Sequence, residues 1–408
     1  MQLKRVMITG YGAVSPYGRG VASMMEGFLN GRSAVRKAPE LAEVQGMRPR
    51  VAALVAGVDP KEIPRKYRRS MSPMSIFATL ACQDAMMQAG VDPASTGDSL
   101  GICFGSTVGS TQATEAFFRD YFRDHSLERM KSTVFFQIMN HSCAANVAQA
   151  LDITGRIMAP SAACSTGCQA VGYGYEQVAL GKQSMLLCGG ADEFHPLTAA
   201  TFDIMHAASF GFNEQPHTTP RPFDRSRDGM VCAEGAGALL LESLESAQAR
   251  GATILGEVCG FATVSDPSNI ANPNGAAMER CMREALADAE LPASAIGYVN
   301  AHATATEQGD IAESDAIFNI FGDKVPVSSL KGHIGHTMAG SGALELIACL
   351  EMMREHRLIP TLNLDEVDPA CSPLNYLREV SEQTVTAVMK NNFALGGVNS
   401  SLVVRSIT

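Results

Sequence analysis

The chain has 408 residues, of which 46% are hydrophobic and 18% charged, and 32 Lys plus Arg against 42 Asp plus Glu give a formal charge of −10. This composition predicts a globular protein with room for two or three domains, or for one large doubled unit. The acidic balance argues against a nucleic-acid or membrane partner, because such surfaces need a broad basic face and the only dense basic block lies at 65–69.

The cysteines and the apolar runs indicate the compartment. The 11 cysteines are an odd number without CxxC pairs or zinc-finger spacing, which predicts free thiols in a reducing cytoplasm. No apolar run reaches the roughly 18 residues that a membrane-spanning helix needs. Residues 1–5 lead into a strand-like run rather than a signal segment.

Short apolar runs alternate with helix-like patterns along the chain, which predicts a layered α/β fold. In the first half we expect a helix at 70–90, closed by Gly90, and strands at 5–9, 100–105, 184–188 and 235–241. In the second half we expect helices at 276–289 and 341–355, and strands at 254–262, 296–301, 325–328, 386–390 and 402–406.

The two halves present similar elements in a similar order, without a residue-level repeat. The best boundary lies near residue 250, within the polar, helix-prone stretch 242–251 and after the proline-containing loop 213–228. The sequence therefore predicts two halves, 1–250 and 251–408.

The sharpest local feature is the segment 161–171, Ser-Ala-Ala-Cys-Ser-Thr-Gly-Cys-Gln-Ala-Val. Cys164 lies where an extended segment turns into a helix, and the positive end of a helix favours a thiolate nucleophile. From this pattern alone a buried structural cysteine is the commoner interpretation. Cys168 falls inside the expected helix and is taken as structural.

Two histidine segments follow in the second half. His302 ends a strand, which is where catalytic groups of open α/β sheets often lie. His333 and His336 lie in a glycine-rich segment before an apolar helix. A metal site at this pair is disfavoured because no carboxylate or thiol stands at ligand spacing beside them, and the glycine pattern does not fit a phosphate-binding loop.

The last feature is the glycine-centred turn at 391–402, between two expected strands. Such turns can direct backbone N–H groups at an oxyanion. By itself the pattern predicts only a hairpin.

Together these segments resemble the β-ketoacyl-[acyl-carrier-protein] synthases of the thiolase superfamily, over essentially the whole chain. The motifs that carry the resemblance are 5–12, the Cys164 segment, 221–224 with 227–229, 300–302 with 309–310, and Lys331 with 335–336. The resemblance implies a thiolase-like duplicated α-β-α-β-α fold, with the nucleophile in the first half and two catalytic histidines in the second.

The resemblance also implies an elongating, Cys-His-His mechanism. Cys164 would take an acyl chain from the phosphopantetheine of an acyl carrier protein, with the backbone N–H groups of Cys164 and Leu395 as oxyanion donors. His302 and His336 would stabilise the enolate formed when malonyl thioester loses carbon dioxide. The carbanion would then attack the acyl-Cys carbonyl, so the chain grows by two carbons. No bound cofactor and no metal are implied.

Further site residues follow from the same resemblance. Lys331 would pair with a carboxylate, for which Glu313 stands at the matching place, and Phe393 would lie beside the nucleophile. The pantetheine arm would bind Thr304 and Thr306. The wall of the acyl pocket would be completed in a dimer by Val108, Phe135 and Phe136.

Four departures from the family pattern concern the gate and its surroundings. The loop that usually reads Gly-Phe-Gly-Gly-Thr-Asn is Ala-Leu-Gly-Gly-Val-Asn at 394–399, and His302 is followed by Ala303 rather than Gly. These changes leave the catalytic groups in place and bear on gating, chain shape and carrier preference. They fit a specialised polyketide or polyene pathway as well as primary fatty-acid synthesis.

Other functions remain open at this level. A non-catalytic, chain-length-determining homologue would lack the nucleophile that Cys164 supplies. A degradative thiolase would need a second cysteine near the C-terminal turn, and a synthase that starts from acyl-coenzyme A would have Asn at position 336.

The expected partners are an acyl carrier protein and either a second copy or a non-catalytic homologue. Basic residues at 65–69, with Arg129 and Lys131, are candidates for carrier docking.

Overall fold

The fold is built from two copies of one strand pattern. The computed structural model describes residues 3–407. The first copy contains β1 (Val6–Ser15), β5 (Leu100–Gly105), β6 (Ile157–Met158), β7 (Met185–Asp192) and β8 (Gly235–Ser243). The second contains β9 (Gly256–Ser265), β10 (Tyr298–Asn300), β11 (Pro326–Ser328), β15 (Ala387–Ala394) and β16 (Val398–Arg405).

The pairing is the same in both copies. The first runs β1-β8-β7-β5-β6 and the second β9-β16-β15-β10-β11. In each copy the first two pairings are antiparallel and the last two are parallel. A short antiparallel pairing of β1 with β9 joins the copies into a 12-stranded sheet that also includes β13 (Asn375–Tyr376) and β2 (Gly18–Arg19).

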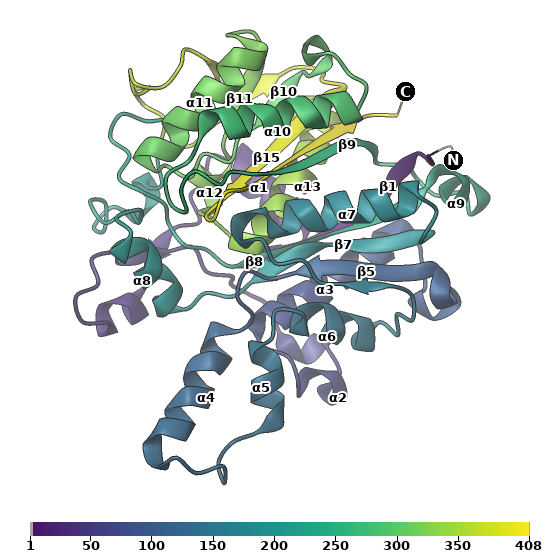
Figure 1. Ribbon diagram of the computed structural model, residues 1–408, viewed down its shortest axis with the longest axis vertical. Coiled ribbons are helices and arrows are strands. Elements are labelled where there is room, and N and C mark those ends of the chain that lie inside the picture. Colours follow the sequence, from purple (N-terminus) through teal and green to yellow (C-terminus); the bar gives the residue numbers. More distant parts are fainter. Residues whose placement is uncertain (1–2, 408) are drawn as a thin grey trace.

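Helices form three layers around these strands (Figure 1). The central layer contains α7 (Thr166–Ala179) and α13 (Ser341–Glu355), which contact each other between the two parts of the sheet. The outer layers contain α3 (Pro73–Ala89) with α6 (Ser142–Ala150), and α10 (Gly275–Asp288) with α11 (Glu307–Phe321). The predicted thiolase-like, duplicated α-β-α-β-α fold is confirmed.

The central helix α13 lacks a one-sided hydrophobic pattern because it is buried on all sides. Of the 15 residues of α13, 13 are buried, from Ser341 to Met353. A helix covered on all sides is apolar all round, and its small residues permit close packing. A Cβ at Gly342 would lie 2.3 Å from the backbone nitrogen of Cys168 on α7. This close approach brings the loop before α13 against the turn that carries Cys164.

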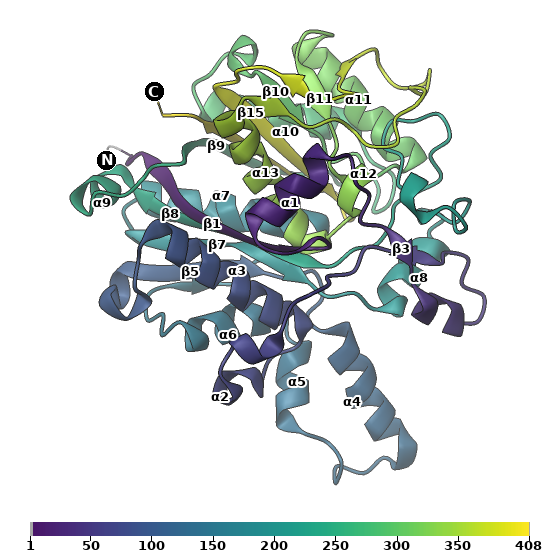
Figure 2. The ribbon, with the colours of Figure 1, turned by 180° about the vertical axis from the view of Figure 1, so that it is seen from behind.

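A helical arm extends from the layered body. It consists of α4 (Thr111–Asp124) and α5 (Ser132–Ile138), and it projects away from the layers in both views (Figures 1 and 2). Several large apolar side chains of the arm are exposed: Phe118, Phe122, Leu127 and Phe135. An apolar surface of this kind marks a site of protein contact.

The remaining helices are α1 (Val21–Leu29), α2 (Arg65–Arg68), α8 (Pro196–Ile204), α9 (Leu244–Ala249) and α12 (Lys331–Ile334). The small strand pairs are β3 (Arg36–Lys37) with β4 (Val51–Ala52), and β12 (Arg357–Leu358) with β14 (Ser381–Glu382). Among residues 3–407, none of the helices has both the length and the apolar character required to cross a bilayer.

Candidate active site

Cys164 lies on a tight turn that leads into the central helix α7. The turn is the 3-10 segment Ala163–Ser165, and α7 begins at Thr166. Ala163 has φ of 47°, a left-handed conformation that is costly for a residue with a side chain. The hydroxyl of Ser165 holds the turn by donating to the carbonyls of Asn392 at 2.9 Å and Val398 at 2.8 Å. The strained turn thus fixes the sulfur against the C-terminal hairpin.

His302 follows the carboxyl end of β10, as the sequence predicts. Its backbone N–H donates to Glu313 Oε1 at 2.8 Å, and that of Ala303 donates to Oε2 at 2.6 Å. The amide nitrogen of Asn392 lies 3.4 Å from His302 Nδ1. With Nδ1 facing a donor, the neutral imidazole carries its proton on Nε2.

His336 follows α12 in the loop before α13. Its backbone N–H donates to the carbonyl of Val231 at 2.8 Å, and its Nδ1 accepts the backbone N–H of Met338 at 3.3 Å. Its Nε2 is buried and has no hydrogen-bond partner among the described residues. The imidazole therefore presents an unused N–H to the space beside Cys164.

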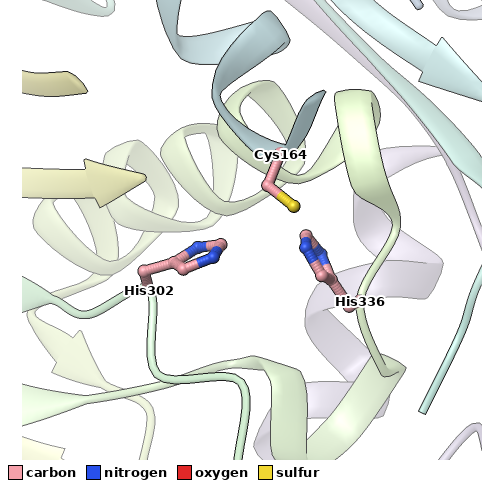
Figure 3. A group of neighbouring side chains, drawn as sticks. All are labelled: Cys164, His302 and His336. Carbon is pink, nitrogen blue, oxygen red and sulfur yellow. The ribbon is translucent and has the colours of Figure 1, made fainter. Parts of the chain in front are cut away.

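The structure brings Cys164, His302 and His336 together (Figure 3). Their ligand atoms all lie within 4.8 Å of one another, and the two imidazole rings are 5.2 Å apart at an interplanar angle of 81°. The group is close enough to hold one thioester or one soft metal ion. The nearby ammonium groups of Lys331 and Lys390 act on both imidazoles, and their positive charge disfavours a divalent metal ion at this place.

The carboxylate partner of Lys331 is Glu345, and the predicted pairing with Glu313 is wrong. Lys331 Nζ donates to Glu345 Oε1 at 2.7 Å, and both side chains are buried. Glu313 instead accepts the two backbone N–H groups at His302 and Ala303. Glu345 lies inside an apolar helix, one turn beyond the buried Ser341, so the local pattern did not indicate it as a site residue.

The resting thiol of Cys164 is neutral, in contrast to the predicted thiolate. Burial raises its pKa to about 11, and the positive charge of Lys331 and the N–H groups of Leu395 and Cys164 only partly oppose this. Burial, and then the nearby cations, lower the pKa values of His302 and His336 well below the usual range. All three groups are therefore neutral near pH 7.

This protonation state predicts the pH dependence of alkylation. Below a pKa of about 11 the thiolate fraction rises with pH, so the rate at which iodoacetamide modifies Cys164 should increase about tenfold per pH unit. Peptide mass spectrometry after timed exposure measures this rate for each cysteine. A rate at Cys164 that levels off near neutral pH would contradict the neutral resting thiol.

The C-terminal turn supplies the oxyanion and gate positions. The N–H groups of Leu395 and Cys164 both approach the sulfur of Cys164. Leu395 is 36% exposed, and Gly396 and Gly397 both have positive φ. A Cβ at Gly397 would lie 2.1 Å from the carbonyl oxygen of Asp266, so a larger residue would displace the turn.

A cavity of about 130 Å³ opens onto the three catalytic candidates. Its lining includes the predicted residues Thr304, Thr306, Phe393 and Leu395. The hydroxyls of the two threonines are 3.1 Å apart, and the ring centre of Phe393 lies 6.5 Å from that of His302.

The predicted wall residues lie elsewhere in the single chain. Val108 and Phe135, 52% and 48% exposed, lie at the base and on the second helix of the arm, and Phe136 is half-buried. None of the three lines the cavity at Cys164. Their predicted role therefore depends on a partner chain.

Asp192 is a further buried group that the sequence did not indicate. It ends β7 and accepts the backbone N–H groups of Ala339 at 2.8 Å and Thr107 at 3.0 Å. It thereby ties the loop after His336 to the base of the arm. Burial raises the pKa of this carboxyl to about 7.

Comparisons with known proteins agree with this site. Residues 3–247 match the N-terminal domain model of β-ketoacyl synthases, and residues 255–365 match the C-terminal domain model. The 3-oxoacyl-[acyl-carrier-protein] synthase 1 of Escherichia coli K12 is 35% identical, over 99% of this chain and 100% of its own.

Two solved structures extend the comparison. A β-ketoacyl synthase from Burkholderia phymatum STM815 is 43% identical, with a TM-score of 0.95 over 99% of this chain and 100% of its own. The ketosynthase of a type II polyketide synthase, solved in complex with its acyl-carrier protein, is 29% identical, with a TM-score of 0.91 over the full length of both chains.

The doubled strand pattern and the Cys-His-His cavity define a condensing enzyme of the thiolase-like class. The two domain models and the full-length relatives then show that the chain belongs to the β-ketoacyl synthase family. The predicted activity, an acyltransferase that catalyses decarboxylating condensation, is confirmed. The alternative of a non-catalytic, chain-length-determining partner is not favoured.

Proposed function

We propose that this chain elongates a carrier-bound acyl group by two carbons, with Cys164 as nucleophile and His302 and His336 as enolate-stabilising donors. In this assignment the half 1–250 provides the nucleophile and the half 251–408 provides both imidazoles. The observation that carries the proposal is the convergence of one thiol and two neutral imidazoles on one cavity.

The first step transfers the acyl chain to Cys164. The sulfur attacks the carbonyl carbon of an acyl thioester, and the thiol proton passes to the departing phosphopantetheine sulfur. The N–H groups of Leu395 and Cys164 face the developing oxyanion, where fixed donors in a dry site act most strongly. Since the resting thiol is neutral, transfer of its proton to the departing sulfur must accompany the attack.

The second step decarboxylates the extender unit and joins the chains. The carboxylate of malonyl thioester leaves as carbon dioxide, and its electron pair becomes an enolate. Two Nε2–H donors, from His302 and His336, hold the enolate oxygen. The enolate carbon attacks the acyl-Cys carbonyl, the Cys164 thiolate departs, and solvent returns its proton.

A two-substrate assay tests this function. Incubation with an acyl-carrier protein and malonyl-carrier protein should give a β-ketoacyl chain two carbons longer and one carbon dioxide per condensation. Labelling the malonyl carboxyl carbon locates the lost carbon. Release of label without product, or product that retains the label, would contradict decarboxylating condensation.

The substrates arrive on the phosphopantetheine arm of an acyl carrier protein, and no further cofactor takes part. Thr304 and Thr306, with neighbouring hydroxyls in the cavity lining, are suited to hydrogen-bond the amides of that arm. The polyketide ketosynthase solved with its acyl-carrier protein supports this mode of delivery.

Exposed basic residues on α2 and directly after it are candidates for carrier docking. Arg65, Lys66 and Arg69 are exposed and none lines the cavity, so they would act on the acidic carrier surface rather than on its arm. The double variant Arg65→Glu, Lys66→Glu should raise KM for an acyl-carrier substrate about tenfold. KM for an acyl-pantetheine thioester should be unchanged; an equal rise for both substrates would argue against docking at α2.

We further propose a dimer that completes the acyl pocket. The edge strand β6 ends the sheet, and Ile157 on it is 54% exposed, which suits pairing with a second β6. The exposed phenylalanines of the arm, with Val108 and Phe136, would then face the partner. Sedimentation should give the mass of two chains, and Ile157→Glu should shift it to one. A monomeric native chain would contradict this arrangement.

The free cysteines fit a reducing compartment. All 11 thiols are unpaired in the structure, and ten of them are buried. A neutral, unoxidised Cys164 is necessary for acyl transfer. We therefore assign the reaction to the cytoplasm.

A further inference from the structure

A second buried lysine lies behind the active site. Lys390, on β15, is fully buried, and its Nζ lies 2.8 Å from Glu345 Oε2. Its ammonium group also donates to the carbonyl of Asn391. Lys331 occupies the other oxygen of Glu345. One carboxylate is therefore shared by two ammonium groups.

The cluster Lys331–Glu345–Lys390 places two lysine side chains around one glutamate in the protein interior. Each of the three side chains is at most 1% exposed. Burying an unmatched charge is costly, and one lysine would have been enough to neutralise Glu345. Glu313, also buried, faces both ammonium groups and partly balances them.

The cluster is coupled to the active site through two facing elements. Lys390 and Asn392 are two residues apart on β15, so their side chains lie on the same face of the strand. Ser341 and Glu345 are one turn apart on α13 and share a face as well. Glu345 meets Lys390, and Ser341 accepts a hydrogen bond from Asn392 at 3.0 Å.

Asn392 completes the connection to the reacting groups. Its amide nitrogen donates to the carbonyl of Cys164 at 3.1 Å and lies 3.4 Å from His302 Nδ1. The ion pair of Lys390 with Glu345 therefore lies two residues along β15 from the amide that stands behind both the nucleophile and the imidazole.

We propose that Lys390 is a positioning residue for condensation, which locks β15 against α13 and supplies the second ammonium group behind the imidazoles of His302 and His336. The proposal rests on the role assigned above to the two imidazoles. It gives a reason for the second buried ammonium group, because two protonated imidazoles whose ring centres are 5.2 Å apart would repel each other.

The electrostatic environment of the imidazoles supports this role. Burial is the first cause that lowers the pKa of each histidine, and the charges of Lys331 and Lys390 lower both further. The titratable groups around them are Cys164 on the nucleophile turn, Asp192 on β7, Glu313 on α11, Lys331 on α12, Glu345 on α13 and Lys390 on β15. Lys390 is one of only two cations in this described set.

A set of charge variants tests the proposal without substrate. Lys390→Met removes one positive charge at similar length, and the double variant Lys390→Met, Glu345→Gln restores the net charge of the cluster. Lys182→Met, at an exposed position, is the matched control for loss of one lysine. Carbon-13 NMR of labelled histidine follows the imidazoles of His302 and His336 from pH 8 down to the lowest pH at which the chain stays folded, with assignment by His302→Gln and His336→Gln.

The pH at which the two imidazoles become protonated should depend on the charge of the cluster Lys331–Glu345–Lys390. In the native chain and in Lys182→Met both imidazoles should begin to protonate only well below pH 6.5, the usual pKa of histidine. In Lys390→Met their protonation should begin at a pH about one unit higher than in the native chain, and the double variant should return to native behaviour. Native-like titration of Lys390→Met, or a double variant that titrates like Lys390→Met, would overturn the electrostatic role.

Activity separates failure of this inference from failure of the proposed function. The pH at which malonyl decarboxylation falls off on the acid side should rise in Lys390→Met by the same amount as the imidazole titration. Thermal melting shows whether each variant is folded at the pH used, and Lys390→Gln replaces any Met variant that is not. A native chain that fails to condense refutes the proposed function, whereas an active native chain with an unshifted Lys390→Met refutes only the inference.

Discussion

Replacing Cys164 with alanine should lower the condensation rate by about 10⁴-fold or more, which is the scale of loss when a covalent nucleophile is removed. The alanine side chain cannot form the thioester that the enolate attacks. The fold should persist, because Cys164 is 6% exposed and alanine occupies less space than the thiol. The rate is measured as formation of the β-ketoacyl product from two carrier-bound substrates.

The remaining activity of this variant is informative. Decarboxylation of malonyl-carrier protein uses His302 and His336 and should continue in Cys164→Ala. Cys164→Ser provides a matched control, since it retains a weak nucleophile of similar size. Retained condensation in the alanine variant would show that the acyl chain is not carried on this sulfur.

Replacing His336 with alanine should slow malonyl decarboxylation and leave acyl transfer to Cys164 intact. Loss of one fixed donor to a developing oxyanion typically costs about 10²-fold to 10³-fold in rate, so malonyl decarboxylation should fall by that amount. Acyl transfer to Cys164 should persist, because the donors for that step are the backbone N–H groups of Leu395 and Cys164. Intact-protein mass follows acylation, and release of labelled carbon dioxide follows decarboxylation.

A conservative variant separates the donor from the fold. His336→Gln retains an N–H donor and should decarboxylate faster than His336→Ala. His217→Ala, at an exposed position, should behave as the native chain does. If His336→Ala lost acyl transfer and decarboxylation equally, His336 would act in a step common to both rather than on the enolate.

Regular elements that are apolar on two faces were the most predictable part of the fold. The helix predicted at 70–90 is α3 (Pro73–Ala89), ended by Gly90 at φ of 64°. The strand at 100–105 and the helix at 341–355 have the predicted bounds. Other strands continue beyond their predicted ends: β1 runs to Ser15 through glycine-rich residues that favour turns in isolation.

Several polar or amphipathic helices were not predicted. The arm helix α4 (Thr111–Asp124) is mostly polar, and only Ala113 of it is buried. Its aromatic side chains contact one another and Phe135 of α5, a pairing between two helices that a single sequence does not reveal. The helix α11 (Glu307–Phe321) was missed because its threonine-rich start was taken only as a ligand-binding segment.

Residues at strand ends and turns were the predictable part of the site. Cys164, His302 and His336 lie together as expected, although their chemical roles stay predictions. The network behind them could not be derived, since it depends on which helix faces which strand. The choice of Glu345 over Glu313, and the presence of Lys390, follow from the packing of α13 against β15.

The protonation state of the Cys164 thiol also could not be predicted from the sequence. A helix N-terminus favours a thiolate, but Cys164 is buried deeply enough that desolvation dominates and its pKa rises to about 11. The extent of burial depends on the surrounding loops, which the local pattern does not reveal. Reactivity therefore depends on proton transfer during the attack rather than on a preformed anion.

The most direct test of acyl transfer is mass spectrometry after brief exposure of the native chain to an acyl-carrier protein alone. We predict that the chain gains the mass of one acyl group, that hydroxylamine removes it as expected for a thioester, and that the modified peptide contains Cys164. An unmodified chain, or an acyl group on any other residue with Cys164 free, would contradict the assignment of this sulfur as the nucleophile.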